Sequence, residues 1–427
     1  MHLYEIPMIC VLVGLALYAV LGGADFGAGL WQLATFADHR RSTIRATRIR
    51  EHAHHSMGPV WEANHVWLIF ILTVTWTAYP TAFGAIASTL AVPLLIAGLG
   101  VVFRGAAYAL RAGTAEPREL ARIDTVFALS SILTPFALGA MIGAIASGRV
   151  PVGNARGGLF SSWLNPTSAL TGVLAIAVGA YLAAVYLAAD ADRGEQRELA
   201  DAFRARALLA ALLAGAVAIA GLAVLHSDAH RIFTRLTGGP GLVGLVISVA
   251  GGLATVSLVV ARRYALARVS AALAVTGMIV GWALAQQPVF LPHLTLQQAA
   301  APHESLVLVL VAIAMGAAIL FPSLGLLFGL LLGGRFDHSA TLENEPQQAA
   351  PRGLLSAAKE GLRARLAFAG LLGGLGFLTA AEAPWAHAVG VVCLFAAMIL
   401  AFLAVDPARI AAVDDELPVR PLRRPGR

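Results

Sequence analysis

Long apolar runs dominate this sequence and leave few structures open to it. We place them near residues 5–35, 61–79, 81–103, 121–147, 166–189, 205–225, 241–261, 264–286 and 305–333, with two weaker runs near 366–382 and 385–405. A helix needs about 20 residues to cross the hydrocarbon core of a bilayer. Only helices and closed barrels satisfy every backbone group in lipid, and these runs are continuous rather than alternating. The sequence therefore predicts an all-α polytopic membrane protein.

Composition agrees with a membrane protein and argues against other classes. Hydrophobic residues make up 58% of the chain and charged residues 13%, whereas a soluble domain carries about 25% charged residues. The net charge of +6 does not predict a nucleic-acid partner, because the arginines lie in short loops between spans, as topology requires. Cys10 and Cys393 both fall inside predicted spans, which excludes a disulfide framework and a CxxC metal site. No Lys or Arg precedes the first run, so we expect no cleaved signal peptide.

The arginines predict the orientation of the chain in the membrane. The loops after the first, third, fifth and seventh spans, with the helix ends beside them, carry most of these residues: Arg40, Arg41, Arg45, Arg48 and Arg50; Arg104, Arg111, Arg118 and Arg122; Arg193, Arg197, Arg204 and Arg206; Arg262, Arg263 and Arg268. The intervening loops hold Arg149, Arg156, Arg231 and Arg235. By the positive-inside rule, the N-terminus is external and the C-terminus cytoplasmic.

The distribution of polar residues predicts three segments. Residues 1–335 form a membrane domain of nine helices, residues 336–364 a polar cytoplasmic linker, and residues 365–427 a helical hairpin with a basic tail. We find no sequence repeat.

Asp25 is the first candidate for chemistry, because it lies within the first apolar run in the stretch "LGGADFGAGLW". Insertion scales put an acid at a helix centre near +2.5 to +3.5 kcal/mol, so Asp25 should face protein or water. Small residues at Gly23 and Gly27, and at Ala24 and Ala28, have the spacing that predicts close helix packing around it. The alternative is an acid near the cytoplasmic end that reaches the interface without a further role.

The stretch "GPVWEANHVWL" supplies the second candidate. Gly58-Pro59 predicts a helix start, and Glu62 and His65 then share one face about one turn apart. The pair could pass a proton, because His titrates near neutrality and Glu can be tuned towards it. The alternative is that Glu62 is simply an anion stabilised by the helix N-terminus. The residues alone leave both interpretations open.

Histidines elsewhere are weaker candidates. His52, His54 and His55 lie in a basic loop, and His226 and His230 lie in "HSDAH". A metal site needs ligands at fixed geometry and usually a further Cys or carboxylate, so solvated loop histidines explain these patterns better.

Four motifs in order carry a resemblance to a known family. "GGADFGAGLW", "GPVWEANHVWL", "VVFRGAAYALR" and "WLNPTSALTGVL" resemble subunit II of the cytochrome bd family of quinol oxidases, whose first two motifs read close to "DGFDMGVG" and "GPxWDGNxVWL". The motifs cover the first five spans, and spans six to nine agree by topology alone. The resemblance implies a bundle of nine helices in the bacterial inner membrane.

The resemblance also implies a function. The complex oxidises quinol and reduces dioxygen to water; the partner, subunit I, carries the haems and the quinol site. This chain is expected to bind no haem and to bring protons from the cytoplasm. Its expected partners are subunit I and the lipid bilayer, with small accessory subunits left open. Asp25 and Glu62 match acids of the first two motifs; the other matching residues are Trp61, Asn64, Trp67 and Arg104.

This chain departs from the family pattern at four positions. Gly22 stands where the first motif has another acid, Glu62-Ala63 replaces Asp-Gly, and His65 replaces a residue that is usually Gln or Glu. The residues after about Thr341 have no family counterpart. Two other functions fit the residues as well: a proton-coupled secondary transporter, which also has buried acids, and a purely structural subunit that shields a partner's haems.

Overall fold

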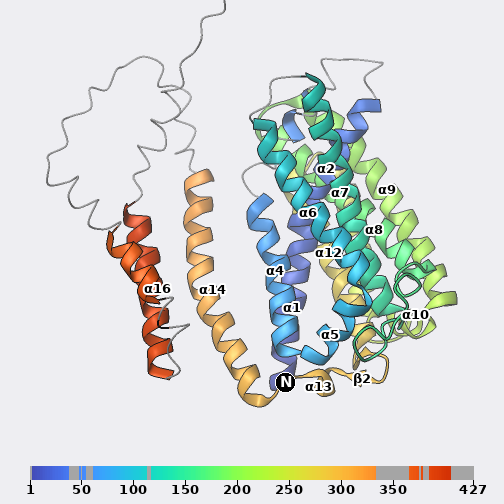
Figure 1. Cartoon of the computed structure of the whole chain (residues 1–427). Helices are drawn as coiled ribbons and strands as arrows, with labels where there is room; N and C mark the ends of the chain where they lie inside the picture. Colours follow the sequence, from blue (N-terminus) through green and yellow to red (C-terminus); the bar gives the residue numbers. More distant parts are fainter. Residues whose placement is uncertain are drawn as a thin grey trace, which may run out of the picture. The chain divides into compact units, whose positions relative to one another are not determined.

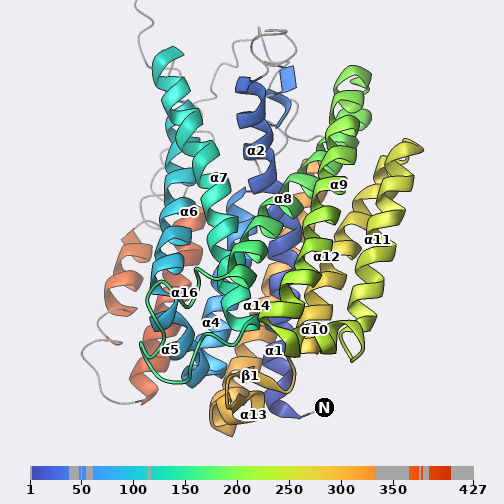
Figure 2. The same cartoon turned by 90° about the vertical axis from the view of Figure 1, so that its right-hand side faces the viewer.

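The computed structural model describes residues 2–37, 48–49, 51–53, 61–112, 117–332, 365–374, 377 and 384–404. The chain divides into two compact units, Met1–Gly325 and Leu326–Arg427. The first unit is almost entirely helical (Figures 1 and 2). Its elements, with α14 running past its end, are the single turn η1 (Leu3–Glu5), α1 (Ile6–Leu17), the π-helical turn η2 (Tyr18–Gly22), α2 (Gly23–Ala37), α4 (Trp61–Ala78), α5 (Pro80–Thr89), α6 (Ala91–Ala112), α7 (Pro117–Ala146), α8 (Pro166–Arg193), α9 (Arg197–Asp228), α10 (His230–Thr237), α11 (Leu242–Val260), α12 (Tyr264–Gln286), β1 (Val289–Leu291), β2 (Leu294–Thr295), α13 (Leu296–Ala299) and α14 (His303–Leu332).

The predicted all-α membrane class is confirmed. Eight helices among the described residues are long and apolar enough to cross a membrane. The predicted count of nine is not confirmed, because the apolar part of α4, Asn64–Ala78, is shorter than those eight. The exception to the helical architecture in the described chain is a small antiparallel hairpin, in which Val289 pairs with Thr295 and Leu291 with Leu294.

Two predicted spans differ from the helices observed. The run 81–103 is broken at Leu90, where α5 ends and α6 begins. Pro93 follows at the third residue of α6, within the first turn, where its missing backbone N–H leaves no helical hydrogen bond unmade. The run 5–35 is continuous but not uniformly α-helical, because η2 interrupts it one turn before Asp25. The helix start predicted at Gly58-Pro59 lies outside the described residues.

Prolines and an asparagine place other helix starts. Pro80, Pro117 and Pro166 each stand at the first position of their helices, where a fixed φ favours helix entry. The Asn165 side chain caps α8 by accepting a hydrogen bond of 3.0 Å from the Ser168 backbone N–H. The sequence thus sets these boundaries locally, independently of what the helices later contact.

Helices α2, α6, α7 and α8 pack side by side and form the surroundings of Asp25 (Figures 1 and 2). Gly27 of α2 faces Gly179 of α8 so closely that a Cβ at either glycine would overlap the opposite backbone. Ala24 and Ala28 of α2 are buried in the same core cluster. The close packing predicted from the small residues of this helix is therefore confirmed.

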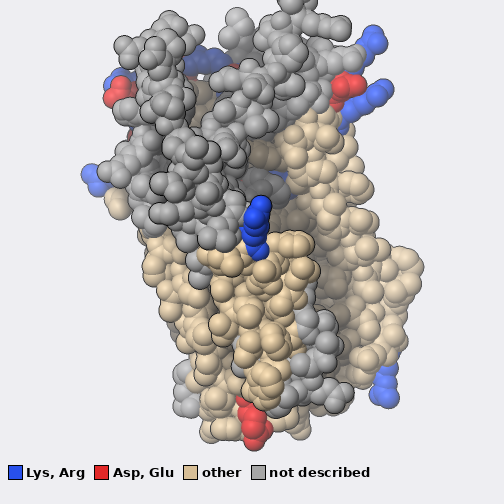
Figure 3. All heavy atoms as spheres, turned by 60° about the vertical axis from the view of Figure 1, so that its left-hand side comes forward, with Lys and Arg blue, Asp and Glu red and all other residues tan. Residues whose placement is uncertain are grey.

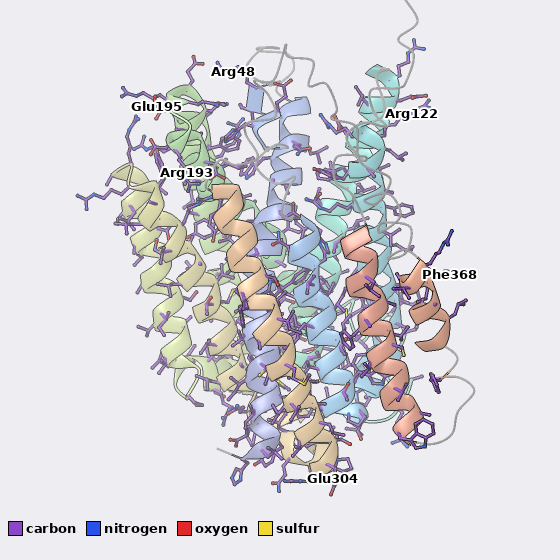
Figure 4. All side chains as sticks on the ribbon, turned by 90° about the vertical axis from the view of Figure 1, so that its left-hand side faces the viewer. Arg48, Arg122, Arg193, Glu195, Glu304 and Phe368 are labelled. Atoms are coloured by element: carbon purple, nitrogen blue, oxygen red, sulfur yellow. The ribbon has the colours of Figure 1, made fainter. Side chains whose placement is uncertain are left out.

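The exterior of the first unit suits a bilayer. Large apolar side chains such as Leu212, Ile219 and Leu253 are mostly exposed. In Figure 3 most of the described surface is tan, and the charged side chains are few and lie mainly near the upper and lower ends of the view. Arg48, Arg122 and Arg193 lie at one end of the first unit and Glu304 at the other (Figure 4).

The second unit contains two helices in the described residues, Arg365–Gly374 and α16 (Pro384–Ala404). They pack closely through glycines: a Cβ on Gly370 would lie 3.1 Å from the Ala397 Cβ, and one on Gly374 would lie 2.7 Å from the Leu394 Cγ. The predicted linker 336–364 lies outside the described residues, so the three-segment division stays a prediction.

Candidate functional site

Asp25 is the centre of the candidate site. It is the third residue of α2, and only 1% of it is exposed. The π-helical turn η2 comes directly before α2, and such turns inside helices occur frequently at functional sites. The site therefore combines a buried acid with an irregular backbone.

Arg104 of α6 neutralises Asp25. Its Nη2 atom lies 2.7 Å from Asp25 Oδ1 and 2.8 Å from the Asp25 backbone oxygen, to both of which it donates. Nη1 donates to the Ser131 hydroxyl on α7. The guanidinium also lies over two aromatic rings, 4.1 Å from the centroid of Phe127 and 5.0 Å from that of Phe26. Arg104 thereby joins α2, α6 and α7 around one buried ion pair.

The two oxygens of the Asp25 carboxylate differ. Oδ1 accepts from Arg104, whereas Oδ2 is buried and has no hydrogen-bond partner among the described residues. Leaving a buried polar atom without a partner costs about 1–3 kcal/mol, and more when the group is charged. Oδ2 therefore has spare capacity to bind a proton or a hydrogen-bond donor.

His65 of α4 is next to this site and is 8% exposed. Its ring meets Phe26 edge-on at a centroid distance of 5.7 Å and Tyr18 edge-on at 6.0 Å. The neighbouring Asn64 donates weakly to the Leu21 backbone oxygen at 3.4 Å. Helix α4 thus brings an imidazole to the segment that carries Asp25.

The other residues singled out from the sequence are placed less fully. Of Trp61 and Glu62 the structure describes the backbone alone, in the first turn of α4. Trp67 lies on the same helix, with its ring edge-on to Phe70 at 6.3 Å, away from the Asp25 cluster. Asp25, Arg104 and His65 are therefore the predicted residues that the described structure gathers.

Sequence reasoning missed three members of the site. Ser131 and Phe127 of α7 contact Arg104, and Tyr18 of η2 contacts His65. A buried hydroxyl or ring in a long apolar helix has no sequence signal that separates it from ordinary packing. A second pair, Arg111 with Asp124, links α6 and α7 at positions seven residues from Arg104 and Ser131. Seven residues are about two turns, so both ion pairs lie along one α6–α7 seam.

The described histidines considered from the sequence as metal ligands contact backbone oxygens or other rings. His52 Nε2 lies 3.2 Å from the Leu187 backbone oxygen, while His54 and His55 lie outside the described residues. His226 and His230 meet edge-on with ring centroids 5.2 Å apart. Within the described ranges, no group of three His, Cys, Asp or Glu side chains is arranged to hold a metal ion.

Fold and site together define a polytopic helical membrane protein with a buried acid–arginine pair. A sequence model of the cytochrome bd terminal oxidase subunit II family matches residues 3–331. This match covers most of the chain, so the chain belongs to the cytochrome bd terminal oxidase subunit II family.

Individual relatives agree with the family. The cytochrome bd ubiquinol oxidase subunit 2 of Bacillus subtilis is 27% identical over 146 residues, which are 34% of this chain and 41% of that protein. The cytochrome bd-I ubiquinol oxidase subunit 2 of Escherichia coli K12 is 29% identical over 185 residues, 42% of this chain and 46% of that protein. Each match thus spans less than half of the relative.

A solved structure shares the fold. A chain of the bd oxidase from Geobacillus thermodenitrificans superposes with a TM-score of 0.61 at 24% identity, covering 78% of this chain and 99% of that chain. The fold therefore extends well beyond the stretches that align with the curated relatives.

Proposed function

We propose that this chain is the non-haem subunit of a bd-type terminal quinol:oxygen oxidoreductase in a bacterial inner membrane. It supports the haem-bearing subunit I and supplies a path for protons from the cytoplasm. Family membership and the names of the relatives support the complex. The single observation that carries the proton path is the buried Asp25, whose Oδ1 is held by Arg104 while Oδ2 has no partner among the described residues.

The proposed path begins at Glu62 and ends at Asp25. Glu62 lies in the first turn of α4, where the helix N-terminus favours its ionised, proton-accepting form. His65, on the same helix as Glu62, carries an imidazole, a group able to relay protons, and its ring contacts Phe26 beside Asp25. Arg104 occupies Oδ1, so Oδ2 is the oxygen that takes the proton. Before Oδ2 takes the proton, the positive charge of Arg104 offsets the negative charge of the buried carboxylate.

We further propose that the haems and the quinol site belong to subunit I. His65 is the one histidine that is buried among the described residues, and its ring is enclosed edge-on by Tyr18 and Phe26. Co-purification of the tagged chain should give a haem-bearing partner; stoichiometric haem on the isolated chain would contradict the proposal.

Asp25→Asn tests the proton path, because it deletes the titration and keeps an oxygen to which Arg104 can donate. We expect quinol-driven oxygen consumption by the intact complex to fall at least about tenfold, within the range for a positioned acid or base, with full haem content. Unchanged turnover would contradict the path, and loss of haem would make Asp25 structural. Substrate-driven flux by the chain alone, without haem, would indicate a transporter instead.

The proposed orientation places the N-terminus outside and the C-terminus in the cytoplasm. The end of the first unit that carries Arg48, Arg122 and Arg193 is then cytoplasmic (Figure 4). Single cysteines at Ser161 and Glu195, in a chain with Cys10 and Cys393 replaced by Ala, test this orientation. A membrane-impermeant thiol reagent should label the first from outside intact cells and the second only after lysis. The reverse pattern would invert the topology.

A further inference from the structure

Tyr18 has a buried hydroxyl that the packing of the bundle does not explain. Only 6% of the residue is exposed, and its hydroxyl has no hydrogen-bond partner among the described residues. A buried phenol normally finds a partner, because leaving it without one costs free energy that phenylalanine would avoid. The oxygen therefore needs a reason other than filling space.

The local backbone gives the Tyr18 ring its place. Tyr18 begins the π-helical turn that ends at Gly22. A Cβ on Gly22 would lie 3.0 Å from Tyr18 Cε2 and 3.1 Å from Cδ2, tighter than ordinary contacts. The ring thus lies against a glycine that has no side chain to displace it. Gly22 is also the position where the resembling motif has an acid, and a side chain there would have to displace this ring by a few tenths of an ångström.

The Tyr18 hydroxyl shares its surroundings with the proposed proton path. The ring meets His65 edge-on at 6.0 Å, and His65 in turn meets Phe26, the residue after Asp25 and one of the rings over which the Arg104 guanidinium lies. Arg104 is already engaged with Asp25 Oδ1 and Ser131. Two buried oxygens, Tyr18 Oη and Asp25 Oδ2, are consequently left without partners in one site.

We propose that Tyr18 is a positioning residue for the proton on Asp25: its hydroxyl is hydrogen-bonded to Oδ2 through one bridging water and aligns it with His65. The hydroxyl donates while the carboxylate is ionised and accepts once Oδ2 is protonated, so no net proton is lost. The inference rests on the proposed proton path. It adds the residue that holds the accepting oxygen in place.

Tyr18→Phe in the purified intact complex tests the proposal, because it removes one oxygen and keeps the ring. We expect kcat to fall about tenfold, equal to about 1.4 kcal/mol of activation free energy, with KM for a soluble quinol within about twofold and an unchanged haem spectrum. The solvent deuterium isotope effect on kcat should rise, since proton delivery becomes slower. Tyr264→Phe is the matched control. Tyr264 is also buried and its hydroxyl also lacks a partner in the described chain, but it lies at the start of α12 and is not part of the Asp25 site, so kcat should not change.

Gly22→Ala supplies a second, independent perturbation. The added methyl must push the Tyr18 ring by a few tenths of an ångström, so kcat should fall in the same direction with the phenol intact. The double variant Tyr18→Phe/Gly22→Ala should be no slower than Tyr18→Phe, because the hydroxyl is already gone. Full additivity of the two losses would overturn the proposal.

The outcomes separate this inference from the proton path itself. If Asp25→Asn slows turnover while Tyr18→Phe leaves kcat within about twofold of the parent, the path stands and the role of Tyr18 is wrong. If Asp25→Asn does not change turnover, the proton path itself is wrong, and the role of Tyr18 falls with it. Loss of haem in Tyr18→Phe would make the hydroxyl a structural group and overturn the proposal as well.

Discussion

Arg104 donates to Asp25 twice, to the side-chain Oδ1 at 2.7 Å and to the backbone oxygen at 2.8 Å, and both side chains are almost completely buried. The guanidinium therefore fixes the carboxylate and the helix that carries it. An ion pair in this setting has two separable properties, its contribution to stability and its ability to take a proton.

The first prediction separates these two properties. Arg104→Met alone leaves a buried carboxylate unpaired, which costs about 3–5 kcal/mol, so thermal stability and haem content of the complex should fall sharply. Asp25→Leu/Arg104→Met removes both charges and should recover most of the stability. Turnover should stay low in the double variant, because the proton acceptor is gone. Thermal unfolding, haem content and oxygen consumption are the measurements; a fully stable Arg104→Met variant would contradict the role of the pair.

The second prediction concerns Glu62. Glu62→Gln keeps size and hydrogen bonding while deleting the titration, so turnover and proton uptake should fall at least about fivefold with full haem. Glu304→Gln is the control, since Glu304 is an exposed acid at the first turn of α14 and lies at the other end of the first unit (Figure 4). Equal turnover in the two variants would leave Glu62 as a helix-start anion.

The third prediction concerns the glycine contact between α2 and α8. Gly27→Ala or Gly179→Ala places a Cβ into the opposite backbone, so the amount of folded complex should drop severely. Gly215→Ala in α9 meets no atom within 4 Å and should leave stability unchanged or raise it by up to about 1 kcal/mol. Yield and thermal unfolding of detergent-purified complex measure both. A mild Gly27→Ala phenotype would show that the helices can separate.

The fourth prediction concerns a clamp at the end of the bundle opposite the arginine-rich one. Arg149 donates to Asp228 at 2.9 and 2.5 Å, and Asp228 also accepts from the Thr167 hydroxyl at 2.5 Å. The network joins the α7–α8 loop, α8 and α9. Asp228→Asn should lower stability by about 1 kcal/mol after solvent screening.

Asp201→Asn is the control for this clamp. Asp201 pairs with Arg262 at 2.9 Å, but both side chains are about half exposed. An exposed pair contributes little, so the melting temperature should hardly change. If the two variants melt alike, the Asp228 network is no more than a surface contact.

Several parts of the fold were predictable because their causes are local. A run of apolar residues must form a helix in lipid, whichever neighbours it meets, so the all-α class followed from the sequence. Helix starts at Pro80, Pro117 and Pro166 followed from the fixed φ of proline. The small residues around Asp25 predicted close helix packing, but they did not predict that the partner helix is α8.

The sequence by itself determined which residues were expensive to bury and therefore worth attention, namely Asp25, and Glu62 with His65 at a helix start. Tertiary structure alone decided that Asp25 meets Arg104, because the two lie 79 residues apart and only the packing of α2 against α6 and α7 joins them. It also decided that the Tyr18 ring meets His65, because the two residues belong to different helical segments, η2 and α4. Burial cost is a property of one residue, whereas the partner that offsets it is a property of the whole bundle.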